Sequence, residues 1–543
     1  MKISVNQYLP AKLWKKNRIL LSILILIFLL IYTKGITKSN LWFSDASRHA
    51  MNGVFLFDLI KNLSIGDLWQ YAYDYYTRYP ALSLGYHLPF FPLIEAIFFA
   101  IGGISFVSAR ITVLFFGMIA LIYWYRLIVL LYDKKVAFFS TIFLFTTPLI
   151  IKWASAPMLE LPALTMIILT AYTFFNYLKN EHCKYLYAFL ICSGLSIMTK
   201  QTTGFISPLL FIYLFVTKNF NKFLKKEAIT PIIIFTILIL SAIIMTLKLG
   251  KANIQQVTMI SNDLTGTVFP VMSLTNLMYY PSQIMDKLSL PLVFLSSFYF
   301  IYVLIKKRTG PDVFFILWIF CAYLMMTYIG VKEPRYTYCM IPPFCLLAAL
   351  ALFKAKIKKI NIGLVTGIIL SIFQIVYAYQ VKTPFISGYE QAAKFVADNP
   401  KGFAALVNLH YNGNFIFYFR KHDTNRQNIV IRSEKLFYYY DEKTDFMEIL
   451  KSYAVKYVIT ENVSSKDFPQ FEYVKKHLNS KNFVKLKEIK IDSNMRRFQG
   501  GSIIIYELKG EVEMKKETLT LQGWRFGRKV SVPLERFKDV PCK

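Results

Sequence analysis

Apolar residues in this chain come in long uninterrupted blocks. The first block, residues 19–32, reads ILLSILILIFLLIY and carries no charge, and similar blocks recur up to about residue 380. A helix needs ~20 mostly apolar residues to cross a bilayer core, so each block predicts one membrane span. The predicted spans are 18–34, 108–131, 135–153, 157–178, 184–199, 203–217, 229–248, 289–305, 312–331, 336–353 and 361–380.

One more apolar run, residues 88–103, is short and contains Pro89, Pro92 and Glu95. The basic loops decide its placement, because Lys and Arg gather on the cytoplasmic side of membrane proteins. If this run does not cross the membrane, all the basic segments of residues 1–359 lie on the same side as the N-terminus, as the rule requires. We therefore expect the run 88–103 to lie in the membrane interface. These segments hold 20 Lys and Arg residues and comprise 1–18, 132–135, 179–184, 218–226, 306–308 and 354–359.

The chain is thus predicted to be a polytopic α-helical membrane protein with about 11 transmembrane helices, interfacial helices in the first outer loop, and a C-terminal extracytoplasmic α/β domain. Residues 1–382 form the membrane domain, with outer loops 35–107 and 249–288. Residues 383–510 form the soluble domain, and 511–543 are a basic tail without a predicted place. Strand-like runs in the soluble domain are 403–409, 428–432, 454–460, 483–491 and 502–508, and helix-like stretches are 388–397, 444–453 and 467–478.

Composition agrees with a membrane protein. The chain is 55% hydrophobic, with a mean hydropathy of +0.42. Its net charge of +31 is scattered through short loops, which is typical of a membrane protein and not of a nucleic-acid surface. The six cysteines form no disulfide framework. The bias toward Lys, Ile and Asn, without a recognised sorting signal, favours a prokaryotic plasma membrane, with the N-terminus cytoplasmic and the C-terminal domain outside.

Candidate chemistry begins at WFSDASRHAMNG, residues 41–52. Ser44 is expected to cap a helix, with Asp45 in its first turn, where a carboxylate suits the helix dipole. The residues Asp45, Arg48, His49 and Asn52 follow helical spacing and share one face. Spacing alone favours an ordinary solvated helix whose other face, with Met51, Phe55 and Leu59, meets the membrane.

Further stretches change this interpretation. They are YHLP (86–89) before the interfacial run, SARITVLFFG (108–117), FTTPLIIKWASAPMLELPALT (145–165), SGLSIMTKQTTGFISPLL (193–210) and VKEPRYTYCMIPPF (331–344). In this order, after an acidic residue in the first outer loop, they resemble the C-type membrane glycosyltransferases, and more narrowly the protein O-mannosyltransferase and lipid A aminoarabinose transferase group. The resemblance covers roughly residues 15–380.

The resemblance implies a polyprenyl-phosphate sugar as donor and a hydroxyl of a lipid, glycan or protein as acceptor, with membrane lipids but no nucleic acid as other partners. Asp45 would be the general base of a direct, inverting displacement. The residues Lys200, Arg335 and Tyr336 would bind the donor phosphate, and Arg48, His49, His87 and Glu160 would line the substrate cavity. The motifs differ from the family pattern at Ala46, Leu88 and Gln201, and the first loop lacks Asp-x-Asp. A divalent cation is compatible with the sequence, which does not require one.

Other interpretations stay open at this point. Lys200 and Arg335 are also suited to anchor helix ends at the interface, and Glu160 to pair with Lys152. The turn HYNGNF (410–415) is the most site-like segment of the soluble domain, but a plain loop is favoured there. A transporter or lipid flippase with an outer binding domain is the alternative function, and a membrane scaffold is a third. Transporters usually place polar residues at mid-membrane and repeat their halves, and neither pattern is visible here.

Overall fold

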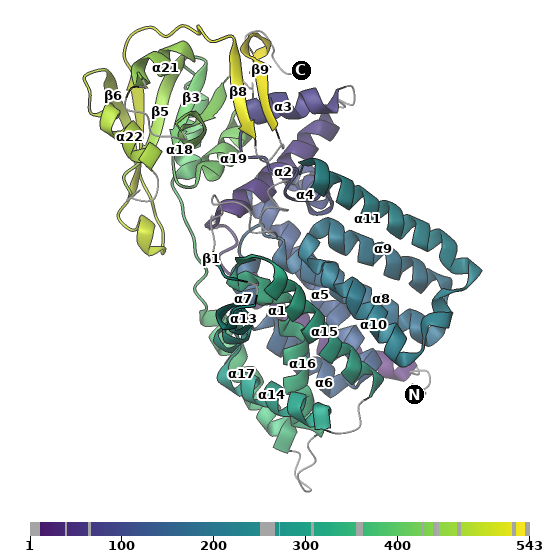
Figure 1. The fold of residues 1–543 in the computed structure, drawn as a ribbon. Helices are drawn as coiled ribbons and strands as arrows, with labels where there is room; N and C mark the ends of the chain where they lie inside the picture. The colour runs from purple at the N-terminus through teal and green to yellow at the C-terminus, as the bar shows by residue number, and fades with distance from the viewer. Residues whose placement is uncertain are drawn as a thin grey trace. The chain divides into compact units, whose positions relative to one another are not determined.

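The structure of the chain is a computed structural model, drawn as a ribbon in Figure 1. It describes residues 11–38, 41–62, 67–249, 267–270, 272–305, 309–354, 362–424, 428–437, 443, 445–463, 469–523 and 528–537. The chain packs as two compact units. The first comprises Met1–Gly35, His87–Phe91 and Val113–Thr383, and the second comprises Ile36–Tyr86, Pro92–Thr112 and Pro384–Lys543.

The first unit is helical. Its 3₁₀ turns are Gln201–Phe205, Phe220–Phe223, Lys226–Ala228 and Pro334–Cys339, and β1 (Thr267–Val268) pairs antiparallel with β2 (Val331–Lys332). Its helices are α1 (Ala11–Tyr32), α5 (Phe106–Leu131), α6 (Lys134–Phe145), α7 (Pro148–Ala154), α8 (Glu160–Asn180), α9 (Cys183–Thr199), α10 (Ile206–Thr217), α11 (Ile229–Leu249), α13 (Leu274–Lys287), α14 (Leu290–Ile305), α15 (Gly310–Tyr328), α16 (Ile341–Lys354) and α17 (Ile362–Gln380). Of these, α5 begins in the second unit.

Each predicted span coincides with a helix or a broken helix. Within the described residues, five helices are long and apolar enough to cross a membrane: Phe106–Leu131, Glu160–Asn180, Lys226–Lys248, Gly310–Tyr328 and Ile362–Gln380. Shorter apolar helices account for the other predicted spans, together with the bent pair Lys134–Phe145 and Pro148–Ala154. The number of spans itself stays a prediction.

The apolar helices differ in how deeply they are packed. In the apolar stretch of α8, 89% is buried inside the structure, whereas in the apolar stretch of α11, 17% is buried. The exposed side chains of α11 include Ile233, Ile237 and Leu240. Contiguous exposed apolar surface of this kind needs an apolar environment, which the lipid of a bilayer provides.

The run 88–103 forms the helix α4 (Phe90–Gly102), which has 13 residues. It is shorter than the ~20 residues that a bilayer core needs, and its placement in the interface stays a prediction. In the second unit, Glu95 of α4 packs on α2 (Ser44–Lys61) at Gly53, where an added Cβ would lie 2.8 Å from the Cβ of Glu95. Gly53 therefore lets the two helices approach closely.

The second unit contains the sheet of the C-terminal segment, with strand order β4-β3-β5-β7-β6. The first three of these strands are parallel, and β7 runs antiparallel to both β5 and β6. All five predicted strands are present: β3 (Ala404–Asn408), β4 (Ile429–Arg432), β5 (Val455–Glu461), β6 (Phe483–Lys490) and β7 (Ser502–Leu508). The buried positions of β3, β4 and β5 on both faces fit a sheet covered by helices.

The helices of this segment are α18 (Tyr389–Asp398), α19 (Asn412–His422), α20 (Ser433–Leu436), α21 (Phe446–Ser452) and α22 (Pro469–Leu478). The predicted helical stretches match α18, α21 and α22. The prediction of a plain loop at 410–415 is wrong, because α19 begins at Asn412. The tail, for which no place was predicted, forms a hairpin of β8 (Thr518–Gly523) and β9 (Arg528–Pro533), and β9 lies against α3 (Leu68–Arg78).

The first outer loop, which the sequence analysis grouped with the spans, packs in the second unit with the C-terminal segment. Arg420 of α19 forms a buried, two-pronged ion pair with Asp58 of α2, with N–O distances of 2.8 and 2.6 Å. Tyr75 of α3 donates to the same carboxylate at 2.7 Å. Each of these buried polar side chains finds a hydrogen-bond partner among the other two. They therefore hold the loop and the C-terminal segment as one packed body.

Candidate active site

A cluster of two cations around one carboxylate lies in the first unit. Glu160 is the first residue of α8, Lys200 joins α9 to the following 3₁₀ turn, and Arg335 lies in the turn Pro334–Cys339. Lys200 Nζ donates to Glu160 Oε1 at 2.7 Å, and Arg335 Nε lies 3.6 Å from the same oxygen. The expected pairing of Glu160 with Lys152 is not among its contacts, and Lys152 lies instead over the ring of Trp153.

Aromatic rings surround the cations of this cluster. Lys200 Nζ lies 5.2 Å from the ring centre of Tyr336 and 5.1 Å from that of Tyr338. The guanidinium of Arg335 lies 5.4 Å from the ring of Trp153 and 5.8 Å from that of Tyr336. Rings at these distances stabilise cations through their negative faces. The structure thus brings together Glu160, Lys200, Arg335 and Tyr336, which the sequence named from separate motifs.

Two cations of this cluster share one carboxylate. Glu160 is 2% exposed, and its Oε2 is buried without a hydrogen-bond partner among the described residues. The side chains of Lys200 and Arg335 are 12% and 11% exposed. Two mostly desolvated cations held side by side suit an anion, and a guanidinium beside an ammonium suits a phosphate in particular.

Asp45 lies in the first turn of α2, in the second unit. The helix begins at Ser44, and Phe43 takes the N-cap position without a side-chain hydrogen bond, so the prediction that Ser44 caps the helix is wrong. Asp45 Oδ1 accepts from Arg48 Nη1 at 3.3 Å, and the two side chains are 17% and 19% exposed. A partly exposed carboxylate beside a guanidinium is able to accept a proton from a bound hydroxyl.

The neighbours of Asp45 on α2 are more buried than expected. His49 is 2% exposed, and Asn52 accepts from the backbone N–H of Ser83 at 2.9 Å. The prediction that Met51 and Phe55 face the membrane is wrong. Both are buried in the second unit, where Phe55 packs edge-on against the ring of Tyr75.

His87 lies in the turn before α4 and is mostly buried. It belongs to the first unit, with the Glu160 cluster, whereas Asp45, Arg48 and His49 belong to the second. Across the described ranges, no group of three or more His, Cys, Asp or Glu residues is arranged to hold a metal ion.

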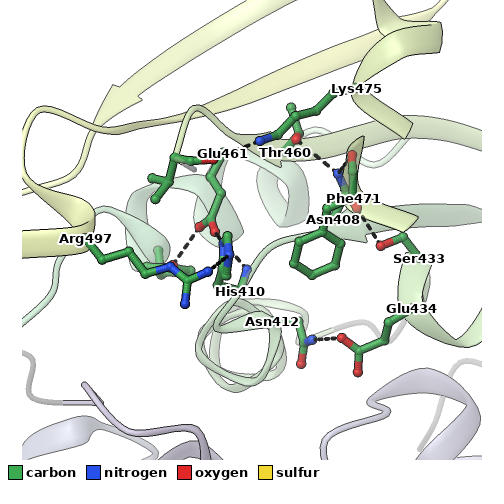
Figure 2. A network of polar contacts seen from close by, with 12 residues as sticks. Asn408, His410, Asn412, Ser433, Glu434, Thr460, Glu461, Phe471, Lys475 and Arg497 are labelled. Atoms are coloured by element: carbon green, nitrogen blue, oxygen red, sulfur yellow. Dashed lines mark hydrogen bonds and ion pairs between the residues drawn. The ribbon is translucent and has the colours of Figure 1, made fainter. Parts of the chain in front are cut away.

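A polar network at the carboxyl ends of β3 and β5 was not predicted from the sequence. Figure 2 shows His410 beside Glu461, with Arg497 on the other side of the imidazole. Glu461 Oε1 accepts from the backbone N–H of His410 at 2.9 Å and contacts its Nδ1, and Arg497 Nη2 lies 2.6 Å from His410 Nε2. The hydroxyl of Tyr389 donates to Glu461 Oε2 at 2.9 Å. The sequence contained a signal for this network, because residues that follow parallel strands meet at one edge of a sheet.

The remaining members of the network tie α20 to β3 and to α19. Ser433 donates to Asn408 Oδ1 at 2.6 Å, and Asn412 donates to Glu434 Oε2 at 2.9 Å. Burial raises the pKa of Tyr389 well above its usual value, and the adjacent Glu461 adds to this, so the phenol stays protonated and remains a donor.

Comparison with known proteins identifies the fold. Residues 86–245 match the family model described as dolichyl-phosphate-mannose-protein mannosyltransferase. This range includes Glu160 and Lys200 but neither Asp45 nor Arg335. A search of curated protein sequences gives no significant match.

The fold is similar to that of two solved membrane-enzyme structures. ArnT from Cupriavidus metallidurans, solved bound to undecaprenyl phosphate, superposes with a TM-score of 0.59 at 11% identity, over 91% of this chain and 98% of that one. The archaeal oligosaccharyltransferase AglB from Archaeoglobus fulgidus, in complex with an inhibitory peptide and a dolichol-phosphate, gives 0.53 at 13% identity, over 82% and 69%. The predicted resemblance to C-type membrane glycosyltransferases is thereby confirmed.

Proposed function

We propose that this chain is an integral-membrane glycosyltransferase. It transfers one sugar from a polyprenyl phosphate to an acceptor hydroxyl on the outer face of the membrane, with inversion at the anomeric carbon. The observation that carries the proposal is the Glu160 cluster, in which the two cations Lys200 and Arg335 are held beside one buried carboxylate. The structures of similar fold were solved with undecaprenyl phosphate or dolichol-phosphate, which supports a lipid-phosphate donor.

The cluster suits the leaving group of this reaction. When the bond between the anomeric carbon and the phosphate oxygen breaks, that oxygen keeps the electron pair, and the phosphodiester becomes a phosphomonoester with one more negative charge. Lys200 and Arg335 are held in place before this charge develops, so they stabilise the transition state more than the bound donor. Tyr336 positions both cations through its ring face.

Asp45 acts as the general base. The acceptor oxygen forms the new bond to the anomeric carbon, and its proton passes to the Asp45 carboxylate. Arg48 at 3.3 Å pairs with that carboxylate and orients it. A single displacement needs one base and no acid, because the phosphate leaves without a proton, and one carboxylate is therefore sufficient.

The acceptor is a hydroxyl of a lipid, an envelope glycan or a protein. The apolar helices place the enzyme in a membrane, and the distribution of basic loops supports a cytoplasmic N-terminus and an extracytoplasmic C-terminal domain in a prokaryotic plasma membrane. Under this topology Asp45, Lys200 and Arg335 all lie at the outer face.

The proposal is tested by measuring transfer from a panel of labelled polyprenyl-phosphate sugars by the purified full-length protein in lipid nanodiscs. Asp45→Asn is expected to lower kcat by about 10²–10⁴-fold. Lys200→Gln and Arg335→Gln are each expected to lower it by roughly 10²–10³-fold, because each removes one preorganised charge from the phosphate.

Lys401→Gln is the matched control, because this exposed lysine pairs with Glu507 in the soluble segment, away from the proposed site residues in sequence. Its transfer rate should equal that of the wild type. The proposal fails if the wild type transfers no sugar from any donor of the panel, and the base assignment fails if Asp45→Asn transfers at the wild-type rate.

A further inference from the structure

The carboxyl ends of β3 and β5 lie at one edge of the C-terminal sheet, because the two strands are parallel neighbours. From β3 the chain passes through α19 to β4 on one side, and then through α20 and α21 to β5 on the other side of β3. Functional residues of open α/β sheets commonly lie at this edge. The first turn of α19, residues 412–415, follows directly from this edge.

The first outer loop packs against this turn. A Cβ added to Gly413 would overlap Ser47 Oγ and lie 3.1 Å from Ser47 Cβ, so only a glycine lets α2 come this close. Asn414 Nδ2 donates to the carbonyl of Leu41 at 2.8 Å in a buried contact. The two contacts lie on either side of Asp45, at Leu41 in the segment before α2 and at Ser47 within α2.

The turn that carries Gly413 and Asn414 is itself held by the network at the strand ends. Glu461 accepts from both the backbone and the ring of His410 (Figure 2). Tyr389 donates to the other oxygen of Glu461. A carboxylate that binds the backbone and the side chain of one residue fixes the direction of the chain there. The direction in which α19 leaves β3 is therefore set by buried groups.

From these contacts we propose that Gly413 and Asn414 are positioning residues for the reaction, and that the first turn of α19 in the C-terminal domain holds the start of α2 so that Asp45 lies at a defined place. This inference rests on the proposed role of Asp45 as the base. It gives the soluble domain a function in the catalytic step. A displacement of about 1 Å in a reacting group lowers rates by up to ~10²-fold, so a small shift of α2 is measurable.

The test is a rescue experiment at the contact between Gly413 and Ser47. Gly413→Ala is expected to lower kcat for sugar transfer by roughly ten- to a hundredfold with little change in the KM for the donor, because donor binding belongs to Lys200 and Arg335. Ser47→Gly removes the side chain that the new methyl group would meet. The double variant G413A/S47G is therefore expected to recover to within about threefold of Ser47→Gly alone.

Gly501→Ala is the matched control. A Cβ at Gly501 would lie 2.8 Å from Val463 Cγ2, so this variant crowds the same segment without a contact to α2. Its kcat is expected to stay near the wild-type value. Equal losses in Gly413→Ala and Gly501→Ala, or no recovery in the double variant, would show that general packing and not the position of α2 controls the rate.

Hydrogen exchange gives a readout that does not depend on activity. In the peptide covering residues 41–55, Gly413→Ala and Asn414→Leu are expected to speed exchange in the first turn of α2, G413A/S47G to restore it, and Gly501→Ala to leave it unchanged. Unchanged exchange in Gly413→Ala would overturn the inference. If the wild type transfers no sugar but these exchange differences hold, the contact with α2 stands and the proposed function alone is lost.

Discussion

Glu160 sets the charge of the cluster in the first unit. Its carboxylate is the acidic partner of both Lys200 and Arg335, and one of its oxygens accepts no hydrogen bond among the described residues. It keeps two mostly buried cations compatible with the fold when no phosphate is bound. A bound phosphate would supply the same compensation, so Glu160 and the donor phosphate compete for the same cations.

This competition predicts the behaviour of Glu160→Gln. The variant leaves two cations without their counter-charge, which we expect to cost roughly 3–5 kcal/mol of folding free energy. Added polyprenyl phosphate should then raise the thermal unfolding midpoint more than in the wild type, because a ligand that binds more tightly stabilises more at a given concentration. Glu390→Gln, which removes an exposed carboxylate paired with Lys421, is the control. Identical lipid-induced shifts in the Glu160→Gln variant and the wild type would contradict this account.

Lys332 offers a second test at the scale of single residues. Its ammonium donates to the carbonyls of Met326 at 3.0 Å and Thr327 at 2.6 Å, and also to that of Ile329, at the end of α15. Burial lowers the pKa of Lys332 from 10.5 to about 8. Because the folded protein holds this proton less tightly than the unfolded chain does, the contribution of Lys332 to stability rises as the pH increases from about 8 to 10.5.

The measurement compares the unfolding midpoints of the wild type and Lys332→Met at pH 8 and pH 10. The midpoint of the wild type minus that of the variant is expected to be larger at pH 10, since the variant has no group that titrates at this position. A difference that is constant or smaller at pH 10 would refute the assigned direction of the pKa shift.

At the scale of elements, the predicted span 135–153 is broken. The helices α6 and α7 meet at an angle of 58°. Pro148 cannot donate a backbone hydrogen bond, so α6 ends at Phe145 and a new helix starts with this proline in its first turn. The break leaves backbone carbonyls at the end of α6 without helical hydrogen-bond donors. The hydroxyl of Tyr32 in α1 donates to one of them, the carbonyl of Phe145, at 2.9 Å.

Tyr32→Phe is therefore expected to destabilise the first unit by about 1–3 kcal/mol, because it leaves a buried carbonyl without its donor while preserving the ring. The ring itself stacks on Phe28 and should remain in place. Thermal unfolding of the purified protein measures the effect. Tyr328→Phe, at an exposed tyrosine of α15, is the matched control, and an equal midpoint in both variants would remove this role of the Tyr32 hydroxyl.

At the scale of the whole chain, the second unit depends on an ion pair between distant segments. Asp58 and Arg420 are 362 residues apart in sequence, and their contact is buried. The pKa of Arg420 is shifted by burial, which lowers it, and by Tyr75 and Asp58, whose combined effect raises it above the usual value, so the guanidinium stays charged. Removing one partner would leave the other charge buried.

Arg420→Met is expected to cost roughly 3–5 kcal/mol and to expose residues 36–86 to protease. The double variant D58N/R420M should lose less stability, because it leaves no unpaired charge. The hydroxyl of Tyr75 also keeps a partner at position 58. Limited proteolysis with mass analysis of the fragments measures this. Protection of residues 36–86 in Arg420→Met equal to that in the wild type would show that the pair does not hold the loop.

The sequence was sufficient for the helices of the membrane domain and the strands of the soluble domain. Apolar blocks and β-branched runs are properties of short segments, and the bilayer or the sheet selects them locally. The start of α19 was missed because Asn412, Gly413 and Asn414 are residues typical of turns, and it is the packing around them that makes this segment helical. Similarly, Phe43 and not Ser44 precedes α2, because helix caps depend on local geometry that spacing does not specify.

Other features depend on three-dimensional packing. The sequence named Glu160, Lys200 and Arg335 from three separate motifs, but their shared carboxylate oxygen exists only where α8, α9 and the turn Pro334–Cys339 meet. The contact of Gly413 with Ser47 likewise joins the two ends of the chain. Such contacts are set by the closure of long loops around a common core, and no local pattern of residues encodes which distant partner each side chain will meet.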